Sequence, residues 1–182
     1  MQAIYDYYSE FGGLSTHYLD DFFFVDRNFK SSSHNALVFD FICSDIGIPQ
    51  APDKRTRPSC TTAFLGIMID SQKWTASLPQ DKLERYTADL TRFAQLTRVK
   101  QRDLQSIIGK LSFAASVVPA RAFLRRLISY VNTVKSPHIL IKLKPEVQAD
   151  VSAWLEFLSK YNVCDLLQIP QSPSPPPSRY GI

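Results

Sequence analysis

The stretch LSTHYLDDFFFV at residues 14–25 decides the fold of this chain. Residues that favour β-strands stand on both sides of its centre. Gly12-Gly13, just before it, end any regular structure formed by the preceding residues. These features predict a β-hairpin that carries Asp20 and Asp21 at its tip.

The two aspartates are the strongest chemical signal in the sequence. Tyr18, Leu19 and three phenylalanines flank them, and a charge in such a setting is costly unless a cation compensates it. Side chains alternate along a strand, so Asp21 can join Tyr18 and Asp20 on one face only if the chain turns there. The pattern predicts a Mg²⁺ site, and the alternative is a pair of aspartates favoured only by a tight turn.

Apolar periodicity beyond the hairpin predicts more of a sheet and a helix that covers it. Ser31-Ser32-Ser33 offers an N-cap for a helix that Gly47 ends. Residues 64–69 are expected to form one strand, residues 70–73 a turn, and residues 74–78 the returning strand of a second hairpin.

The sequence from residue 79 onward predicts helices. Pro79 is expected at the first position of one helix. A second helix is expected to include residues 104–115. A third is expected to start at Pro119 and to carry Ile128 on its apolar stripe. A further helix is expected over residues 145–161. The chain is therefore predicted to be an α+β protein.

Positive charge is concentrated in the middle of the chain. Residues 1–78 hold 6 basic and 9 acidic side chains, residues 79–135 hold 11 and 4, and residues 136–182 hold 4 and 4, which gives −3, +7 and 0. This distribution is expected when one face meets a polyanion. The alternative is a helical surface that carries Lys and Arg for solubility alone.

The remaining chemistry-bearing residues indicate an intracellular protein without a disulfide framework or a zinc site. Cys43, Cys60 and Cys164 are far apart, with no C-x-x-C spacing, and the three histidines show no metal-ligand spacing. No secretion signal and no membrane-spanning run is visible, so we expect a cytoplasmic or nuclear chain with no membrane partner.

Five blocks of sequence resemble one family of enzymes. HYLDDF at residues 17–22 resembles the Y-x-D-D signature of reverse transcriptases. Four further blocks resemble, in the same order, segments of DIRS-like retrotransposons, which encode a tyrosine recombinase. They are DIGIPQAPDK at 45–54, FLGIMID at 64–70, LPQDKL at 78–83 and LQSIIGKLSFA at 104–114. The resemblance covers roughly residues 14 to 160 and implies RNA-directed DNA polymerase as the activity.

The resemblance implies roles for residues of the polymerase palm. Asp20 would be the principal metal ligand, Asp21 its neighbour in the same site, and Tyr18 a packing residue beside the primer end. Lys54 matches the lysine proposed to protonate the departing pyrophosphate, although a lysine on such a loop is otherwise a solvated charge. Phe64-Leu65-Gly66 matches the primer grip, and the alternative is a core strand with a bulge.

The helical segment would be the polymerase thumb, with cations that contact phosphates. The cations expected to bind nucleic acid are Lys82, Arg85, Arg92, Lys110, Arg121 and Arg125. All of them except Lys110 lie on two polar stripes. One stripe also holds Asp89, and the other also holds Ser129 and Asn132. Gly109 in a helix interior suggests the close approach of another helix or of a duplex backbone, and we expect helix packing.

These assignments predict four segments. They are a partial palm over residues 1–78, a basic helical thumb over 79–135, a connecting helical segment over 136–168 and a disordered proline-rich tail over 169–182. The tail holds five prolines and three serines.

The expected function is that of a truncated reverse transcriptase domain from a retrotransposon polyprotein. Its partner would be a primer-template, either an RNA/DNA hybrid or a DNA duplex, and its ancestral reaction would be nucleotidyl transfer with two Mg²⁺ ions. A third carboxylate and the fingers would lie upstream and a ribonuclease H domain downstream, so the isolated chain is expected to be inactive. The alternatives are a non-catalytic nucleic-acid-binding module and a decayed reading frame without function.

Overall fold

The structure is a computed structural model that describes residues 14–19, 21–51, 55–133 and 140–166. Asp20, Lys54 and the proline-rich tail, for which the sequence makes predictions, lie outside the described residues. The chain divides into two compact units at Gln72 and Lys73. Helices and antiparallel hairpins alternate along it, which confirms the predicted α+β class.

The first unit begins with the predicted hairpin. Strand β1 (Leu14–Tyr18) pairs with β2 (Asp21–Val25) in an antiparallel ladder that places Tyr18 opposite Asp21. Leu19, at the tip, has a φ of 54°, in the region that turn residues adopt. The sequence therefore predicted both the strands and the position of the turn.

Helix α2 (Phe29–Asp45) follows the hairpin. Its N-cap is Asn28, whose side-chain oxygen accepts a hydrogen bond of 2.9 Å from the backbone N–H of Ser31. The predicted cap within Ser31-Ser32-Ser33 was therefore wrong, because Asn28 caps the helix three residues earlier. Gly47, with a φ of 72°, follows the end of the helix as predicted.

A second hairpin follows, formed by a turn that the sequence did not predict. The predicted turn over residues 70–73 is found at residues 71–74, and strand β5 (Thr75–Ser77) follows it, within the strand predicted over 74–78. Strand β3 (Thr61–Phe64) pairs with β4 (Ile67–Asp70) around Leu65 and Gly66, whose φ angles are 49° and 76°. Positive φ at both central residues is the geometry of a two-residue hairpin turn that matches strand twist. The prediction of one strand over residues 64–69 was therefore wrong.

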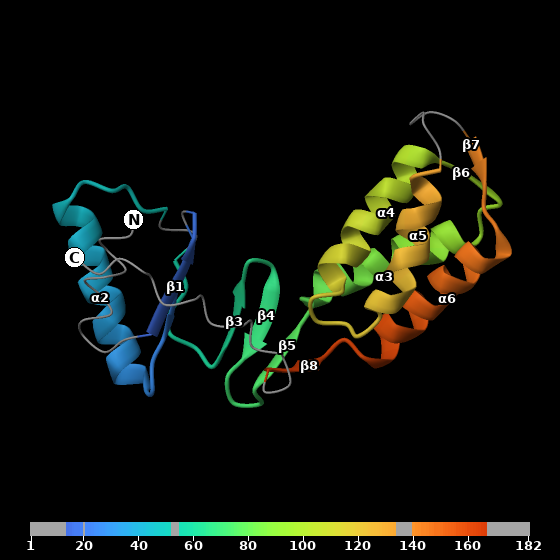
Figure 1. Ribbon diagram of the computed structural model, residues 1–182. Coiled ribbons are helices and arrows are strands. Elements are labelled where there is room, and N and C mark those ends of the chain that lie inside the picture. The colour runs from blue at the N-terminus through green and yellow to red at the C-terminus, as the bar shows by residue number, and fades with distance from the viewer. Residues whose placement is uncertain (1–13, 20, 52–54, 134–139, 167–182) are drawn as a thin grey trace, which may run out of the picture. The chain divides into compact units, whose positions relative to one another are not determined.

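Aromatic side chains hold the first unit together, and they alternate along β2. Phe22 and Phe24 contact Phe39 of α2, with ring centroids 4.8 Å and 5.1 Å away. Phe23 points to the other face, where its ring stacks on Phe64 at 4.8 Å. Such ring pairs each contribute about 0.5–1.5 kcal/mol beyond area burial. The helix thus covers one face of the hairpin, as Figure 1 shows for α2 beside β1.

The described residues of the second unit form four α-helices, which Figure 1 labels α3 to α6. They are α3 (Gln80–Ala94), α4 (Gln101–Ala114), α5 (Leu124–Val131) and α6 (Pro145–Lys160). Helix α6 packs against α3 and α5, and α4 packs against α3 and α5. Leu90, Leu104, Leu127 and Trp154 are among the fully buried side chains of this core. None of the helices in the described residues combines the length and apolarity that crossing a membrane requires.

Three details of the predicted helices need correction. Pro79 is the N-cap of α3 and not its first helical residue. The helix expected to start at Pro119 begins instead with a 3-10 turn, η2 (Arg121–Phe123), ahead of α5. Ile128, expected on the apolar stripe, is 38% exposed.

Two short strand pairs were not predicted. Strand β6 (Arg98–Lys100) pairs with β7 (Leu140–Lys142), and β5 (Thr75–Ser77) pairs with β8 (Cys164–Asp165). Next to β8, the side-chain amide of Asn162 accepts a hydrogen bond from the backbone N–H of Leu78 at 3.1 Å. The same amide donates to the Leu78 carbonyl at 3.2 Å. These contacts join the two ends of the second unit.

The two units differ in how much apolar surface they bury. Among the described residues of the first unit, Cys43 is the one buried apolar residue, whereas the rest of the buried apolar side chains belong to the second unit. Phe29, Leu37 and Phe41 of α2 are 71%, 63% and 72% exposed. Since apolar burial is the main stabilising contribution, the first unit is expected to be the less stable one.

Native-state hydrogen exchange of the whole chain should therefore show residues 14–70 exchanging faster than residues 79–133. The physical reason is that local opening needs less free energy where few apolar contacts are lost. Mass spectrometry of peptides from both regions measures the difference. Equal protection in the two regions would contradict the expected difference in stability.

Candidate functional site

The first unit places Tyr18 and Asp21 on the same face of the hairpin. They are directly opposite residues in the ladder, and such pairs project to one side. Phe22 and Phe24 face α2, so alternation along β2 places Asp21 with Phe23 on the other side. Tyr18 is 59% exposed, and Asp21 is exposed as well. The turn thus brings together two of the predicted site residues on a face that α2 does not cover.

The chemistry of this face is suited to a hard cation. An exposed carboxylate such as that of Asp21 is the oxygen donor that Mg²⁺ prefers, and Asp20 precedes it directly in the sequence. In the described part of the chain, no group of three or more His, Cys, Asp or Glu side chains is gathered in one place. The role of Asp20 and Asp21 as metal ligands therefore stays a prediction from the sequence.

The predicted primer-grip residues lie at and beside the tip of the β3–β4 hairpin. Leu65 is 43% exposed, and Gly66 gives the tip its second residue with positive φ. Phe64 is instead held in the stack with Phe23. The alternative of a core strand with a bulge was wrong, because the chain reverses direction here.

Arg55, the first described residue after the gap at residues 52–54, contacts α2. Arg55 forms an ion pair of 2.5 Å with Asp40. Burial raises the pKa of the nearby Cys43 thiol above its ordinary value. A hydrogen bond with Gln50 opposes this rise in pKa, and the negative charge of Asp40 adds to it. Cys43 is therefore a protonated core residue and not a reactive thiolate.

The second unit contains a groove of about 430 Å³ between the end of α4 and the η2–α5 segment. It is lined by Ser112, Ala115, Ser116, Arg121, Leu124, Arg125, Ile128 and Ser129. Two guanidinium groups and three hydroxyl groups are thus gathered around a concave surface, and none of the lining residues is acidic. The sequence predicted Arg121, Arg125 and Ser129 as one stripe but missed Ser112 and Ser116. Ser112 lies in the last turn of α4 and Ser116 in the turn that follows it, and no local pattern links the two to the arginines.

A neighbouring arginine of α5 has a different role. Arg126 lies 3.3 Å from the Asp150 carboxylate on α6, and Asp150 is only 4% exposed. Arg126 also donates to the Glu146 carbonyl at 3.4 Å. These contacts join α5 to α6, whereas Arg121 and Arg125 form no ion pair with any other described residue and line the groove.

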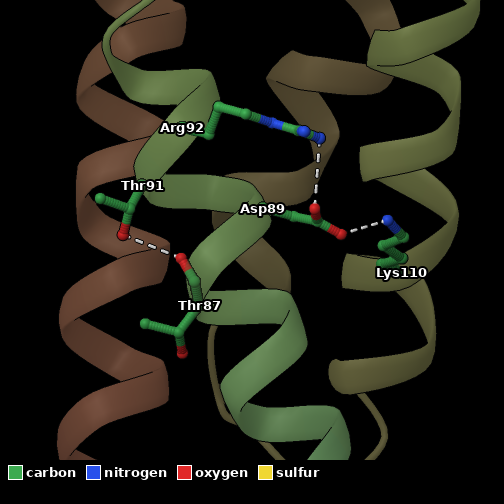
Figure 2. A network of polar contacts seen from close by, with 5 residues as sticks. All are labelled: Thr87, Asp89, Thr91, Arg92 and Lys110. Carbon is green, nitrogen blue, oxygen red and sulfur yellow. Dashed lines mark hydrogen bonds and ion pairs between the residues drawn. The ribbon is translucent and has the colours of Figure 1, made fainter.

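The other predicted nucleic-acid-binding cations lie along α3 and α4 and are engaged with protein groups. Lys110 lies 2.5 Å from one oxygen of Asp89, and Arg92 lies 3.3 Å from the other, as Figure 2 shows. Lys82 lies over the Phe113 ring at 4.3 Å from its centroid. Arg85 lies over the ring of the adjacent tyrosine at 5.6 Å. The six predicted cations therefore form two groups. Arg121 and Arg125 line the groove, and the other four lie on α3 and α4 in contact with protein groups.

Gly109 does not serve the packing that the sequence suggested. It is exposed, and a Cβ atom built on it would meet no neighbouring atom within 4 Å. The expected close helix packing at Gly109 was therefore wrong. The surface of α4 at Gly109 is open, and the other interpretation, the approach of a duplex backbone, stays a prediction.

Comparison with known proteins identifies the fold. No protein-family model matches the chain. A search of curated proteins also found no match. Solved structures, however, show that the chain has a reverse-transcriptase-like fold.

The structures that it resembles are of a foamy viral protease-reverse transcriptase. One, in complex with double-stranded DNA, superposes with a TM-score of 0.63 at 19% sequence identity and covers 81% of this chain. The other, in complex with an RNA/DNA hybrid, gives a TM-score of 0.65 at 16% identity and covers 88% of this chain. This chain spans only 24% and 21% of the length of those two proteins. At such low identity the likeness concerns the fold alone.

The open surface at Gly109 leads to a prediction about stability. Gly109→Ala should stabilise the second unit by about 1 kcal/mol, because alanine has the higher helix propensity and no neighbour stands in its way. Urea unfolding followed by circular dichroism measures the change. Gly47→Ala is the matched control, because it also meets open space but has a φ of 72°, and it should destabilise the protein. A destabilised Gly109→Ala variant would show that the surface of α4 is not open.

Proposed function

We propose that this chain forms the palm hairpin and the thumb of an RNA-directed DNA polymerase, and that its second unit binds primer-template duplex. The observation that carries the proposal is the groove, which presents Arg121 and Arg125 with three hydroxyl groups and no carboxylate on a reverse-transcriptase-like fold. The two solved structures of that fold were determined with a DNA duplex and with an RNA/DNA hybrid, which supports the choice of ligand.

The lining of the groove is suited to phosphodiester groups. A guanidinium group presents several N–H donors in a planar fork that matches the oxygens of a phosphate. The hydroxyl groups of Ser112 and Ser129 add donors without adding charge, whereas that of Ser116 donates to the Phe113 carbonyl at 2.7 Å. Such contacts fix the position of a duplex and do not read its sequence, so the proposed binding is independent of base sequence.

Gly109 supports the same ligand. It lies one helical turn before Ser112 on α4, and no side chain covers it. A backbone without a side chain allows a nucleic-acid strand to come close to the helix. We propose that the duplex lies along this surface of α4 beside the groove.

The hairpin of the first unit is proposed as the metal-binding part of the palm. Asp20 and Asp21 would hold Mg²⁺, which supplies activation of the primer hydroxyl and stabilisation of the leaving pyrophosphate. Tyr18 would pack beside the primer end, Leu65 and Gly66 would grip the primer, and Lys54 would protonate the pyrophosphate. These roles rest on the sequence blocks that resemble DIRS-like retrotransposons, and we propose membership of that group on the same basis.

Polymerisation is proposed as the activity of a larger protein. Transfer would need a third carboxylate and the segments that hold the incoming nucleotide, and these 182 residues match about a quarter or less of each solved reverse transcriptase. By itself the chain would bind duplex without extending it. A non-catalytic nucleic-acid-binding module is the second candidate, and the location of the whole groove within the compact second unit favours it.

The groove can be tested through the salt dependence of binding. Replacing Arg121 and Arg125 by alanine should weaken binding of a labelled duplex about equally for all sequences. It should also flatten the slope of log affinity against log salt by roughly one to two units, since fewer phosphates are neutralised. Fluorescence anisotropy over a salt series measures both effects.

The matched control replaces Arg98 and Lys142, two exposed cations that face each other across β6 and β7. This double variant loses the same charge and should keep most of the parent slope. If both double variants lose affinity and slope equally, binding depends on overall charge and not on the groove. If the parent protein binds no duplex at low salt, the proposed function is wrong.

The expected inactivity of the isolated chain is tested by primer extension. With Mg²⁺ and all four nucleotides, the purified 182-residue chain should add no nucleotide to an annealed primer. The Asp20→Ala variant is the background control, because it lacks the proposed principal ligand. Incorporation by the parent above that background would overturn the proposal that further segments are needed.

A further inference from the structure

Asp89 occupies a central position among the cations of α3 and α4. Its two carboxylate oxygens contact different partners, with Lys110 of α4 at 2.5 Å and Arg92 of its own helix at 3.3 Å. Figure 2 shows the carboxylate between the two side chains. Its side chain is 20% exposed, compared with 32% for Lys110 and 79% for Arg92. One carboxylate thus offsets one of two neighbouring positive charges.

The location of this network makes it relevant to nucleic acid. Lys110 directly follows Gly109, the open position on α4. Phe113 lies one turn further along α4, and Lys82 of α3 lies over its ring. Lys110 points to a neighbouring face of α4, about 100° around the helix from Gly109. On that face its side chain is 32% exposed and paired with Asp89. A duplex that spans both faces would therefore meet Lys110 while the lysine is still paired with Asp89.

We propose that Asp89 is a positioning residue that competes with duplex phosphates for Lys110 and Arg92 and so limits the affinity of the thumb for nucleic acid. The inference rests on the proposed duplex binding and adds a residue that regulates its strength. A phosphate that contacts Lys110 replaces the carboxylate as its partner. The gain from that contact is therefore smaller than the gain from a cation such as Arg121, whose charge is not offset by a carboxylate in the groove.

This competition has a measurable consequence in the number of counterions released. Each phosphate that a cation neutralises changes the slope of log affinity against log salt by about 0.9. In the parent protein, Asp89 offsets about one such contact. An uncharged residue of the same shape at this position should restore it, and the slope should become steeper by roughly one unit.

The experiment compares Asp89→Asn with Glu156→Gln. Both variants remove one negative charge that is paired with a lysine, since Glu156 lies 2.7 Å from Lys160 on α6. In a salt series with a labelled duplex, Asp89→Asn should bind up to about eightfold more tightly near 0.1 M salt and show the steeper slope. Glu156→Gln should remain close to the parent. If the two variants behave alike, the effect is one of net charge and the role of Asp89 is refuted.

A double-mutant cycle with Lys110→Gln separates regulation from structure. Lys110→Gln should change the slope little in the parent protein, where Asp89 already offsets the lysine, and by roughly one unit in the Asp89→Asn background. A merely structural role would give equal changes in both backgrounds and would refute the inference. Circular dichroism identifies any variant that fails to fold. If Asp89→Asn fails to fold, Asp89→Glu replaces it, and because this variant keeps the negative charge it should retain the salt slope of the parent protein.

Duplex binding by the parent protein distinguishes a failure of the proposed function from a failure of the proposed role of Asp89. If the parent binds no duplex at any salt concentration, the proposed function fails and the inference fails with it. If the parent binds and the cycle shows no coupling between Asp89 and Lys110, the inference alone fails.

Discussion

The alternation of side chains along β2 is the constraint on which the first unit depends. Phe22 and Phe24 must face Phe39 to form the aromatic contacts with α2, and Phe23 must then face Phe64 on the other side. A shift of the ladder by one residue would exchange the two faces and lose every one of these contacts. The same alternation places Asp21 on the side away from α2. The packing of the core thus fixes the location of the candidate metal ligand.

Local patterns in the sequence were sufficient to predict the first hairpin and most of the helices, because their periodicity is set by neighbouring residues. They failed at Leu65 and Gly66, where a continuous apolar run hid a chain reversal. The turn depends on a positive φ at both residues, and leucine gives no signal for that conformation. The strand pairs β6–β7 and β5–β8 were missed for another reason, since each joins segments that are distant in the sequence.

The candidate site shows the same division between local and distant information. The polar stripe that contains Arg121 and Arg125 could be predicted from helical spacing, and the structure places both at one groove. The pairing of Lys110 with Asp89 could not, because 21 residues separate them and only the packing of α3 on α4 brings them together. The open surface at Gly109 is a related case, since a glycine in a helix gives no indication of whether a protein or a ligand approaches it.

The charge of a segment is therefore a poor measure of its capacity to bind a polyanion. Residues 79–135 carry eleven cations, but Arg126 is committed to a buried carboxylate on α6, and Lys110 and Arg92 share Asp89. An ion pair between protein groups lowers the gain from a phosphate contact, because the phosphate must replace a partner that is already present. If the proposed duplex binding holds, cations such as Arg121 and Arg125, which line a groove without a carboxylate, would make the larger contribution per residue. On this argument the arrangement of acidic residues, more than the number of basic ones, determines how strongly such a surface binds nucleic acid.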